Sequence, residues 1–403
     1  MWALVFAIFA LQTPDYTADG MKALDEGRYE AAAQAFSKAV EADPKDYTSH
    51  FNLALAYSML GKDAEGVAEY RKALEIHPKL YEAELNAGIL LLRQKNPADA
   101  LPLLSDAAEQ KPGEFRPRFY LAEAQLQSGT PEAAEASYRK ALEIDGKSAP
   151  AELGLAHALA RQDKLADAAP HFRKAAELDP KDREYLLELA GLYEKSGQTD
   201  EAVGIYREFP NNPAAQQRAG ELLLQAKQFG AAIPQLEAAY QKSPTPANRL
   251  ALAKAYVSAR QFEKALPLLD QAVAAAPSDY DLRMLYALAL RDRKQYPGAA
   301  AQFLAAARLN PEDAQTWGEL GGMLYLSSAY PQALAAFDKA RSLGQDTPGN
   351  WFFRAIILDK LKQLKPALEA YQKFLSISQG KNPDQEFEAR QRARIIQREL
   401  EKR

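Results

Sequence analysis

The stretch "YRKALEIHPKL" runs from Tyr70 to Leu80. Nearly the same eleven residues return as "YRKALEIDGKS" from Tyr138 and as "FRKAAELDPKD" from Phe172. The offsets are 68 and 102 residues, which are two and three times 34. Self-similarity at a fixed period of this length is the signature of a repeat array. We therefore expect the 403 residues to form a one-dimensional array rather than two or three separate globular domains.

A common register holds through eleven units when Pro78 is placed at position 32 of the second unit. Positions 8 and 20 contain only glycine or alanine, as in Gly88 and Ala100, whereas position 24 is always large, as in Leu104. Two antiparallel helices approach to about 8 to 10 Å where small side chains meet, and a bulky residue fills the space beyond. Each unit is therefore predicted to be a helical hairpin, whose second helix usually ends before the proline at position 32.

This hairpin resembles the tetratricopeptide repeat, which has 34 residues, small side chains at positions 8 and 20, and a large one at position 24. Alanine at position 27 in nine of the eleven units and proline at position 32 strengthen the resemblance, which covers about Thr13 to Ser376. The resemblance implies an all-α fold, a right-handed α-solenoid superhelix of about eleven hairpins. The segment 382–403 resembles the solvating helix that closes such arrays. Its predicted buried face carries Ala389, Ala393, Ile396 and Leu400.

The sixth unit departs from the period, because it is four residues shorter than 34. The stretch "FPNNP" from Phe209 to Pro213 is expected to stop its second helix early. The sequence therefore predicts a joint here. The expected organisation is a signal segment at 1–12, repeats one to six at 13–212, repeats seven to eleven at 213–381, and the capping helix at 382–403.

Composition and charge narrow the possible functions. The chain is 47% hydrophobic and 26% charged, which is typical of a folded soluble protein. Its 50 Lys and Arg residues oppose 54 Asp and Glu residues, with no long run of one sign, so no nucleic acid or anionic membrane partner is predicted. The absence of cysteine excludes disulfides and thiolate metal sites, and fits either a reducing or an oxidising compartment.

The N-terminus bears on localisation. Residues Trp2 to Leu11, "WALVFAIFAL", form an unbroken apolar run that has the length of a signal-peptide core and is too short to span a bilayer. We expect export to the periplasm or secretion, with a mature chain that begins near Thr13. Because no Lys or Arg precedes the run, two alternatives stay open: a cytoplasmic protein whose apolar N-terminus folds back on the first repeat, or an uncleaved membrane tether.

No catalytic, metal or cofactor site is predicted. The histidines occupy different helices or turns without metal-ligand spacing, and we interpret them as ordinary surface or interface residues. They are His50, His77, His157 and His171. The sequence therefore favours a non-enzymatic protein.

The resemblance implies instead a concave groove lined by the first helix of each repeat, at positions 2, 5, 9, 12 and 13. This groove is apolar near the N-terminus, which is typical of a surface that binds an extended or helical protein segment. The alternative is that curvature buries position 5 between repeats. The predicted partner-binding residues are Phe51, Asn52, Leu55, Met59, Leu85, Asn86, Ile89, Leu92 and Phe119.

Two further features lie in this predicted groove. Asn52 and Asn86 both fall at position 6, where the resemblance implies amides that pair with a ligand backbone, although only two units carry them. In the tenth unit Gly318 and Gly322 leave bare backbone near Tyr325, through which either a ligand approaches closely or the helices pack loosely.

The function predicted from these observations is a protein–protein interaction scaffold that binds a partner segment in the groove. The alternative is a structural component of a cell-envelope or secretion assembly that contacts its partners through edges and the convex face. The expected partner is a protein or peptide, with no nucleic acid, no membrane span and no cofactor, and the oligomeric state stays open.

Overall fold

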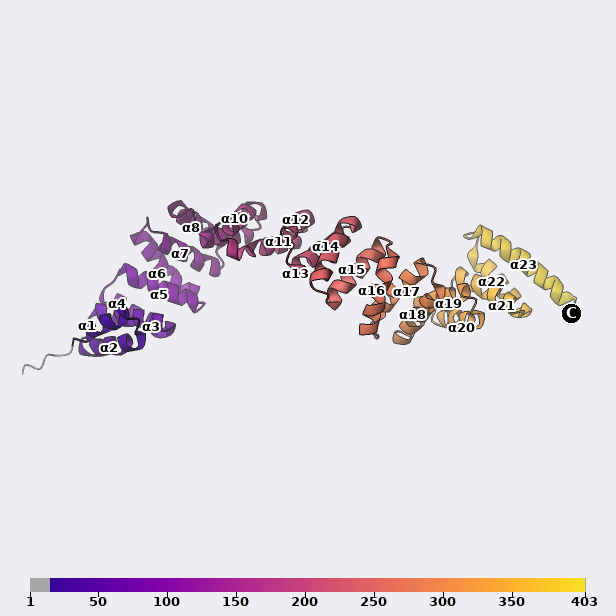
Figure 1. The fold of residues 1–403 in the computed structure, drawn as a ribbon, viewed down its shortest axis with the longest axis horizontal. Coiled ribbons are helices and arrows are strands. Elements are labelled where there is room, and N and C mark those ends of the chain that lie inside the picture. The colour runs from indigo at the N-terminus through magenta and orange to yellow at the C-terminus, as the bar shows by residue number, and fades with distance from the viewer. Residues whose placement is uncertain (1–14, 403) are drawn as a thin grey trace, which may run out of the picture. The chain divides into compact units, whose positions relative to one another are not determined.

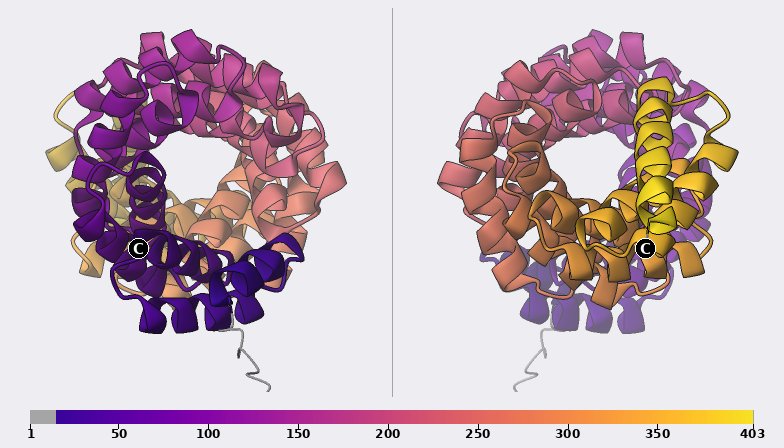
Figure 2. Two further views of the ribbon diagram at one scale, coloured as in Figure 1. Left: turned by 90° about the vertical axis from the view of Figure 1, so that its left-hand side faces the viewer. Right: turned by 90° about the vertical axis from the view of Figure 1, so that its right-hand side faces the viewer.

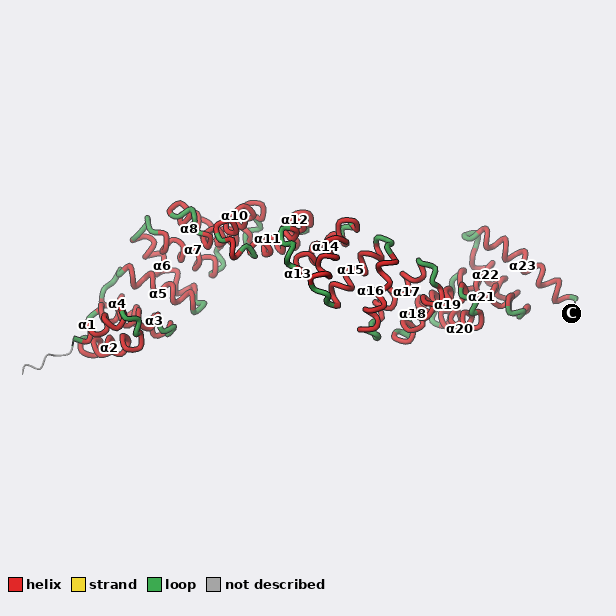
Figure 3. Tube along the Cα trace, viewed as in Figure 1, coloured by secondary structure: helices red, strands yellow, loops and turns green. Residues whose placement is uncertain are grey.

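The computed structural model describes residues 15–402, which form α-helices, one short 3-10 helix at Pro180–Asp182 and no strand (Figures 1 and 3). The helices follow one another in hairpins, so the predicted all-α array is confirmed. The first helices of the hairpins are α1 (Tyr16–Asp25), α3 (Tyr47–Met59), α5 (Tyr81–Arg93), α7 (Phe115–Gln127), α9 (Ala149–Ala160), α11 (Tyr185–Lys195), α13 (Pro213–Gln225), α15 (Pro246–Ser258), α17 (Tyr280–Asp292), α19 (Ala314–Leu326) and α21 (Pro348–Lys360). The second helices are α2 (Tyr29–Ala42), α4 (Asp63–Ile76), α6 (Pro97–Gln110), α8 (Pro131–Ile144), α10 (Leu165–Leu178), α12 (Thr199–Arg207), α14 (Phe229–Lys242), α16 (Phe262–Ala275), α18 (Tyr296–Leu309), α20 (Tyr330–Ser342) and α22 (Leu364–Ser378), and α23 (Pro383–Glu401) follows them.

The chain divides into two compact units, which we call unit 1 and unit 2. Unit 1 ends at Ile205 and unit 2 begins at Tyr206, so the division falls within α12. The apolar segment from Trp2 to Leu11 lies outside the described residues, and export therefore stays a prediction.

Small side chains face large ones across every hairpin, as the register predicts. A Cβ atom added to Gly88 would lie 2.5 Å from Cγ of Leu104, and one added to Gly220 would lie 2.4 Å from Cγ of Leu236. Both distances are far below van der Waals contact, so only glycine allows these helices to pack so closely. The position-24 side chains themselves are among the largest fully buried ones: Phe36, Tyr70, Leu104, Tyr138, Phe172, Phe303 and Tyr371.

The turn inside each hairpin uses one left-handed residue, always at position 15. At Lys95, for example, the amide groups of Lys95 and Asn96 donate to the carbonyls of Leu92 and Leu91, both at 2.9 Å, which closes the end of α5. Only four of these residues are glycine, so the packing of the hairpin imposes the conformation on other side chains as well. The eleven left-handed residues at position 15 are Gly27, Gly61, Lys95, Gly129, Asp163, Gly197, Lys227, Arg260, Lys294, Ser328 and Lys362.

Side chains at position 4 hold the turn between hairpins. A ring or guanidinium nitrogen there donates to the carbonyl of the proline six residues earlier, which lies beyond the end of a helix and needs a donor. The pairs are His50 with Pro44 at 3.1 Å, Arg283 with Pro277 at 2.7 Å, and Trp317 with Pro311 at 2.9 Å. Of the surface or interface positions expected from sequence for the histidines, His50 occupies a buried one, and its Nδ1 lies 2.6 Å from Oε2 of Glu69.

The sixth hairpin ends as the sequence predicts, because α12 has only nine residues. The loop that follows belongs to unit 2 and is bound by it. The side-chain amide of Gln216, which is buried, donates to the carbonyls of Tyr206 at 3.2 Å and Phe209 at 3.1 Å. Nζ of Lys242 donates to the carbonyl of Pro210 and to Oδ1 of Asn211, both at 2.6 Å.

We expect limited proteolysis to begin in the loop from Phe209 to Asn212, and Gln216→Leu to accelerate it. Losing two hydrogen bonds at about 1 kcal/mol each would raise the fraction of molecules in which this loop is detached roughly five- to thirtyfold. The matched control is Gln217→Leu, because Gln217 donates only to Glu221 on its own helix. Equal cleavage rates for the two variants, measured by mass spectrometry of the fragments, would show that Gln216 does not restrain this loop.

Helix α23 closes unit 2 with the face predicted from sequence. Ala389 and Ile396 are fully buried, and Ala393 and Leu400 pack against the same apolar cluster of α21 and α22. Figure 2 shows this final helix in yellow, packed on the last hairpin. Nε and Nη2 of Arg392 donate to the two carboxylate oxygens of Asp359, both at 2.8 Å, and fix its register on α21.

Candidate functional site

A hollow of about 570 Å³ lies across the first helices of unit 1. Successive first helices contact one another there, α5 with α7 and α7 with α9, so their outward residues form one continuous surface. Its volume is within the range of natural ligand sites, roughly 300 to 1,000 Å³. The apolar part of the lining comes from Ile89, Leu92, Phe119, Tyr120, Pro150 and Leu153.

Aromatic rings form the centre of this hollow. The ring of Phe119 lies 5.5 Å from that of Phe115, 5.2 Å from that of Tyr120 and 6.1 Å from that of Tyr138. Tyr138 is completely buried and its hydroxyl donates to Glu123. Burial raises the pKa of Tyr138, and the charge of Glu123 raises it further, so the hydroxyl stays protonated and the ring stays in place.

The charged side chains of the hollow already have partners. Arg93 pairs with Asp63 at 3.1 Å, and Nε2 of His157 lies 3.0 Å from Oε2 of Glu188. The hydrogen bond from His157 lowers the pKa of Glu188, although burial opposes this. The charged groups of Arg93 and His157 are therefore engaged within the protein, which leaves the apolar atoms of α5, α7 and α9 for a ligand.

The structure brings three of the sequence-predicted groove residues, Ile89, Leu92 and Phe119, together in this hollow. Two others lie in the core, since Leu85 is 4% and Asn52 is 8% exposed.

The remaining predicted residues lie elsewhere on α3 and α5. Phe51 and Leu55 are half-buried and Met59 is 51% exposed. Nδ2 of Asn86 donates to the hydroxyl of Tyr70 at 3.3 Å, so this amide already has a partner in the preceding repeat.

Sequence reasoning missed several residues that line the hollow, among them Pro150 and His157. Both stand at groove positions of the fifth unit, positions 2 and 9, so extending the same register by one more repeat would have found them. Tyr120 stands at position 6, which the sequence analysis assigned to the groove only in the two repeats that carry asparagine there.

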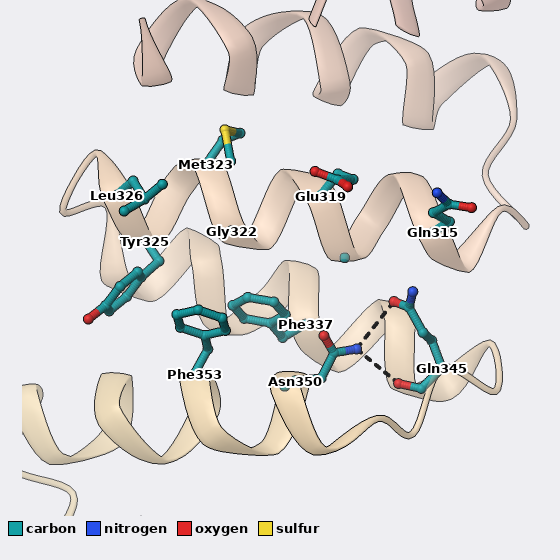
Figure 4. Close-up of a pocket in the computed structure, with 12 residues that line it drawn as sticks. Gln315, Glu319, Gly322, Met323, Tyr325, Leu326, Phe337, Gln345, Asn350 and Phe353 are labelled. Carbon is teal, nitrogen blue, oxygen red and sulfur yellow. Dashed lines mark hydrogen bonds between the residues drawn. The ribbon is translucent and has the colours of Figure 1, made fainter. Parts of the chain in front are cut away.

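Unit 2 contains a second hollow, of about 440 Å³, between α19 and α21 (Figure 4). It includes the bare backbone noted in the sequence. A Cβ atom added to Gly322 would meet nothing within 4 Å, whereas one added to Gly318 would lie 2.4 Å from Oε1 of Gln345. The Gln345 side chain thus covers the first glycine, and the second remains open to the hollow.

One carboxylate, that of Glu319, lines the second hollow. Nη1 of Arg291 donates to its two oxygens at 3.1 and 3.2 Å, and Arg291 also binds Oδ1 of Asp292. Burial lowers the pKa of Arg291, but its bonds to Glu319 and Asp292 outweigh this and raise it. One guanidinium is therefore shared by two carboxylates.

Across residues 15–402, no group of three His, Cys, Asp or Glu side chains is arranged to hold a metal ion. In the same range, no helix combines the length and apolarity needed to cross a membrane.

Comparison with known proteins identifies the family. The tetratricopeptide repeat profile matches residues 18–80, 85–149, 153–215, 250–314 and 287–350, more than half of the chain. Cellulose synthase operon protein C of Xanthomonas axonopodis pv. citri (strain 306) is 32% identical over 165 residues, which cover 38% of this chain and 11% of that protein. Photosystem I assembly protein Ycf3 of Cyanophora paradoxa is 35% identical over 79 residues, covering 19% of this chain and 45% of that protein.

The chain thus spans less than half of the length of each of these curated relatives. Among solved structures, MamA from Desulfovibrio magneticus RS-1 matches 41% of this chain and 94% of its own, with 24% identity and a TM-score of 0.40. The repeat register, the eleven hairpins and the family profile agree, and the chain belongs to the tetratricopeptide repeat family.

Proposed function

We propose that this protein is a non-enzymatic scaffold whose unit 1 hollow binds an apolar segment of a partner protein. Proteins of this repeat family serve in general for protein–protein interaction, which supports the class of function. The observation that carries the site is the aromatic centre around Phe119, which is open to the hollow while its neighbouring charges are engaged elsewhere.

The chemistry of the hollow favours apolar side chains in the bound segment. Binding there costs little desolvation of charge, because Arg93 and His157 keep their partners Asp63 and Glu188. Rigid aromatic residues at the centre of an interface contribute most of its affinity. A segment that places one or two large apolar side chains over Phe119 would use this surface fully.

We expect Phe119→Ala to weaken such binding by about 2 kcal/mol or more, because it removes the aromatic anchor that the bound segment would cover. The probe is a set of peptides selected for binding to the full chain from a random display library, with affinities measured by calorimetry. Phe387→Ala is the matched control, since Phe387 is 63% exposed on α23. Equal losses for the two variants, with unchanged helix content in both, would place the binding site elsewhere.

One observation favours the alternative function, contact through second helices. An apolar groove of about 680 Å³ lies on unit 2 between α18 and α20, over Trp317, Leu320 and Leu324 of α19. Four small residues of α18 and α20 line this groove: Ala300, Ala301, Ala335 and Ala336. The same peptide selection separates the two sites: peptides whose binding is abolished by Leu304→Asp, and not by Phe119→Ala, would support contact through this groove.

A further inference from the structure

The hollow of unit 2 differs chemically from that of unit 1, because its aromatic wall faces hydrogen-bond acceptors. The rings of Phe337 and Phe353 are parallel within 1°, with centroids 5.9 Å apart, and the ring of Tyr325 lies 5.1 Å from that of Phe353. Figure 4 shows these rings between α19 and α21. Tyr325 and Phe353 are only half-buried, so parts of both rings remain accessible.

Beside the rings, the amide of Asn350 is arranged so that its oxygen faces the hollow. Nδ2 of Asn350 donates to the backbone carbonyl of Gln345 at 2.9 Å and to its Oε1 at 3.2 Å. This uses the donor side of Asn350, and its Oδ1 turns toward Phe337 (Figure 4). The open backbone at Gly322 leaves room for a flat group near this oxygen and the rings.

The charge around the hollow is negative. Glu319 is the one ionisable acid or base among its lining residues, apart from the hydroxyl of Tyr325. Arg291 neutralises only part of the local charge, because it is shared between Glu319 and Asp292. The three charges sum to one negative charge, and Figure 4 shows Glu319 on the side of α19 opposite to the rings.

We propose that this hollow binds a planar cation, the guanidinium group of an arginine side chain from a partner protein. A guanidinium stacks on aromatic faces and is attracted by their π-electrons. It carries five N–H donors and no acceptor, which matches the acceptor Oδ1 of Asn350. The carboxylate of Glu319 attracts its charge from the other side of α19. An ammonium group is compact and strongly hydrated, so lysine fits the flat space less well.

This inference concerns a different unit and a different chemistry from the proposed apolar site, and either can fail alone. The probe is Nα-acetyl-L-arginine methylamide, titrated into the full chain while the amide resonance of Gly322 is followed by NMR. Its uncharged isostere, Nα-acetyl-L-citrulline methylamide, is the ligand control. We expect saturable shifts at Gly322 and binding of the arginine probe roughly three- to tenfold tighter than that of citrulline.

Two substitutions should change the affinity for the arginine probe in opposite directions. Glu319→Gln should weaken binding of the arginine probe roughly three- to tenfold, since it removes the charge. Arg291→Gln should strengthen binding by a similar factor, roughly three- to tenfold, because it frees the Glu319 carboxylate from its internal partner. Glu263→Gln, on an exposed side chain paired with Arg293, is the matched control and should leave binding unchanged.

Three results would overturn the proposal. The first is the absence of saturable shifts at Gly322, and the second is equal binding of the citrulline probe. The third is weaker binding in both Glu319→Gln and Arg291→Gln, because that pattern means the ion pair only supports the shape of the hollow.

Discussion

Replacing Gly154 by alanine is expected to destabilise unit 1 by about 1 to 3 kcal/mol, the usual cost of overpacking a filled core. The added Cβ would lie 2.3 Å from Cζ of Tyr138. That ring has no room to move, because Tyr138 is fully buried and its hydroxyl is held by Glu123. Urea unfolding followed by circular dichroism measures the change. Because each repeat of an array contacts mainly its neighbours, we expect unit 1 of this variant to unfold at a lower urea concentration than unit 2.

Gly191→Ala provides the matched control for Gly154→Ala. Gly191 also lies inside a first helix, α11, but a Cβ atom added there would meet nothing within 4 Å. Alanine should therefore stabilise this helix by roughly 0.5 to 1 kcal/mol through its higher helix propensity. The same chemical change then has opposite signs at two positions of the array. If both variants are stabilised, the close contact between Tyr138 and α9 is wrong.

The hairpins could be predicted because their packing needs one residue size at each of a few positions. Glycine or alanine at positions 8 and 20 and a large residue at position 24 are requirements of contact between two helices, so they recur in all eleven units. The early end of α12 followed from proline chemistry in the same way, since Pro210 and Pro213 cannot continue a helix.

Two features could not be predicted from the repeat register: the left-handed turn residues and the size restriction at Gly154. Lys95, Asp163 and Arg260 adopt left-handed φ values of 57° to 58° although their side chains disfavour them. Packing of the flanking helices imposes this conformation, and local sequence carries no sign of it. Gly154 stands at position 6, where its size matters only because the Tyr138 ring of the preceding hairpin crosses that point.

The candidate site was predictable in part for a similar reason. The register places Ile89, Leu92 and Phe119 on the outward side of the first helices, and they do line the unit 1 hollow. Burial of Leu85 depends on how closely α5 and α7 approach, which is a property of the packed array rather than of either helix. The acceptors of the unit 2 hollow depend on the loop between α20 and α21, which positions Gln345 against Asn350.

A second large effect is expected from Ile396→Asp in α23. Ile396 is fully buried in a cluster that includes Phe352, Leu358 and Phe374. A carboxylate there would lose the burial of the isoleucine, about 1.5 to 3 kcal/mol, and would add an unpaired buried charge. We expect α23 to separate from α22 rather than to bury that charge. The loss of stability is then no larger than the free energy with which α23 binds to the last hairpin.

Separation of α23 has its own signature, which distinguishes it from general unfolding. Amide hydrogens of α23 should exchange rapidly while those of α19 and α20 remain protected, and the exposed cluster should bind an apolar dye. Ile395→Asp is the matched control, because the adjacent side chain is 41% exposed and its replacement should change stability by no more than about 0.5 kcal/mol. If both variants exchange alike in α23, then α23 does not dock through the Ile396 face. The apolar face of α21 and α22 would in that case be covered by something other than this helix.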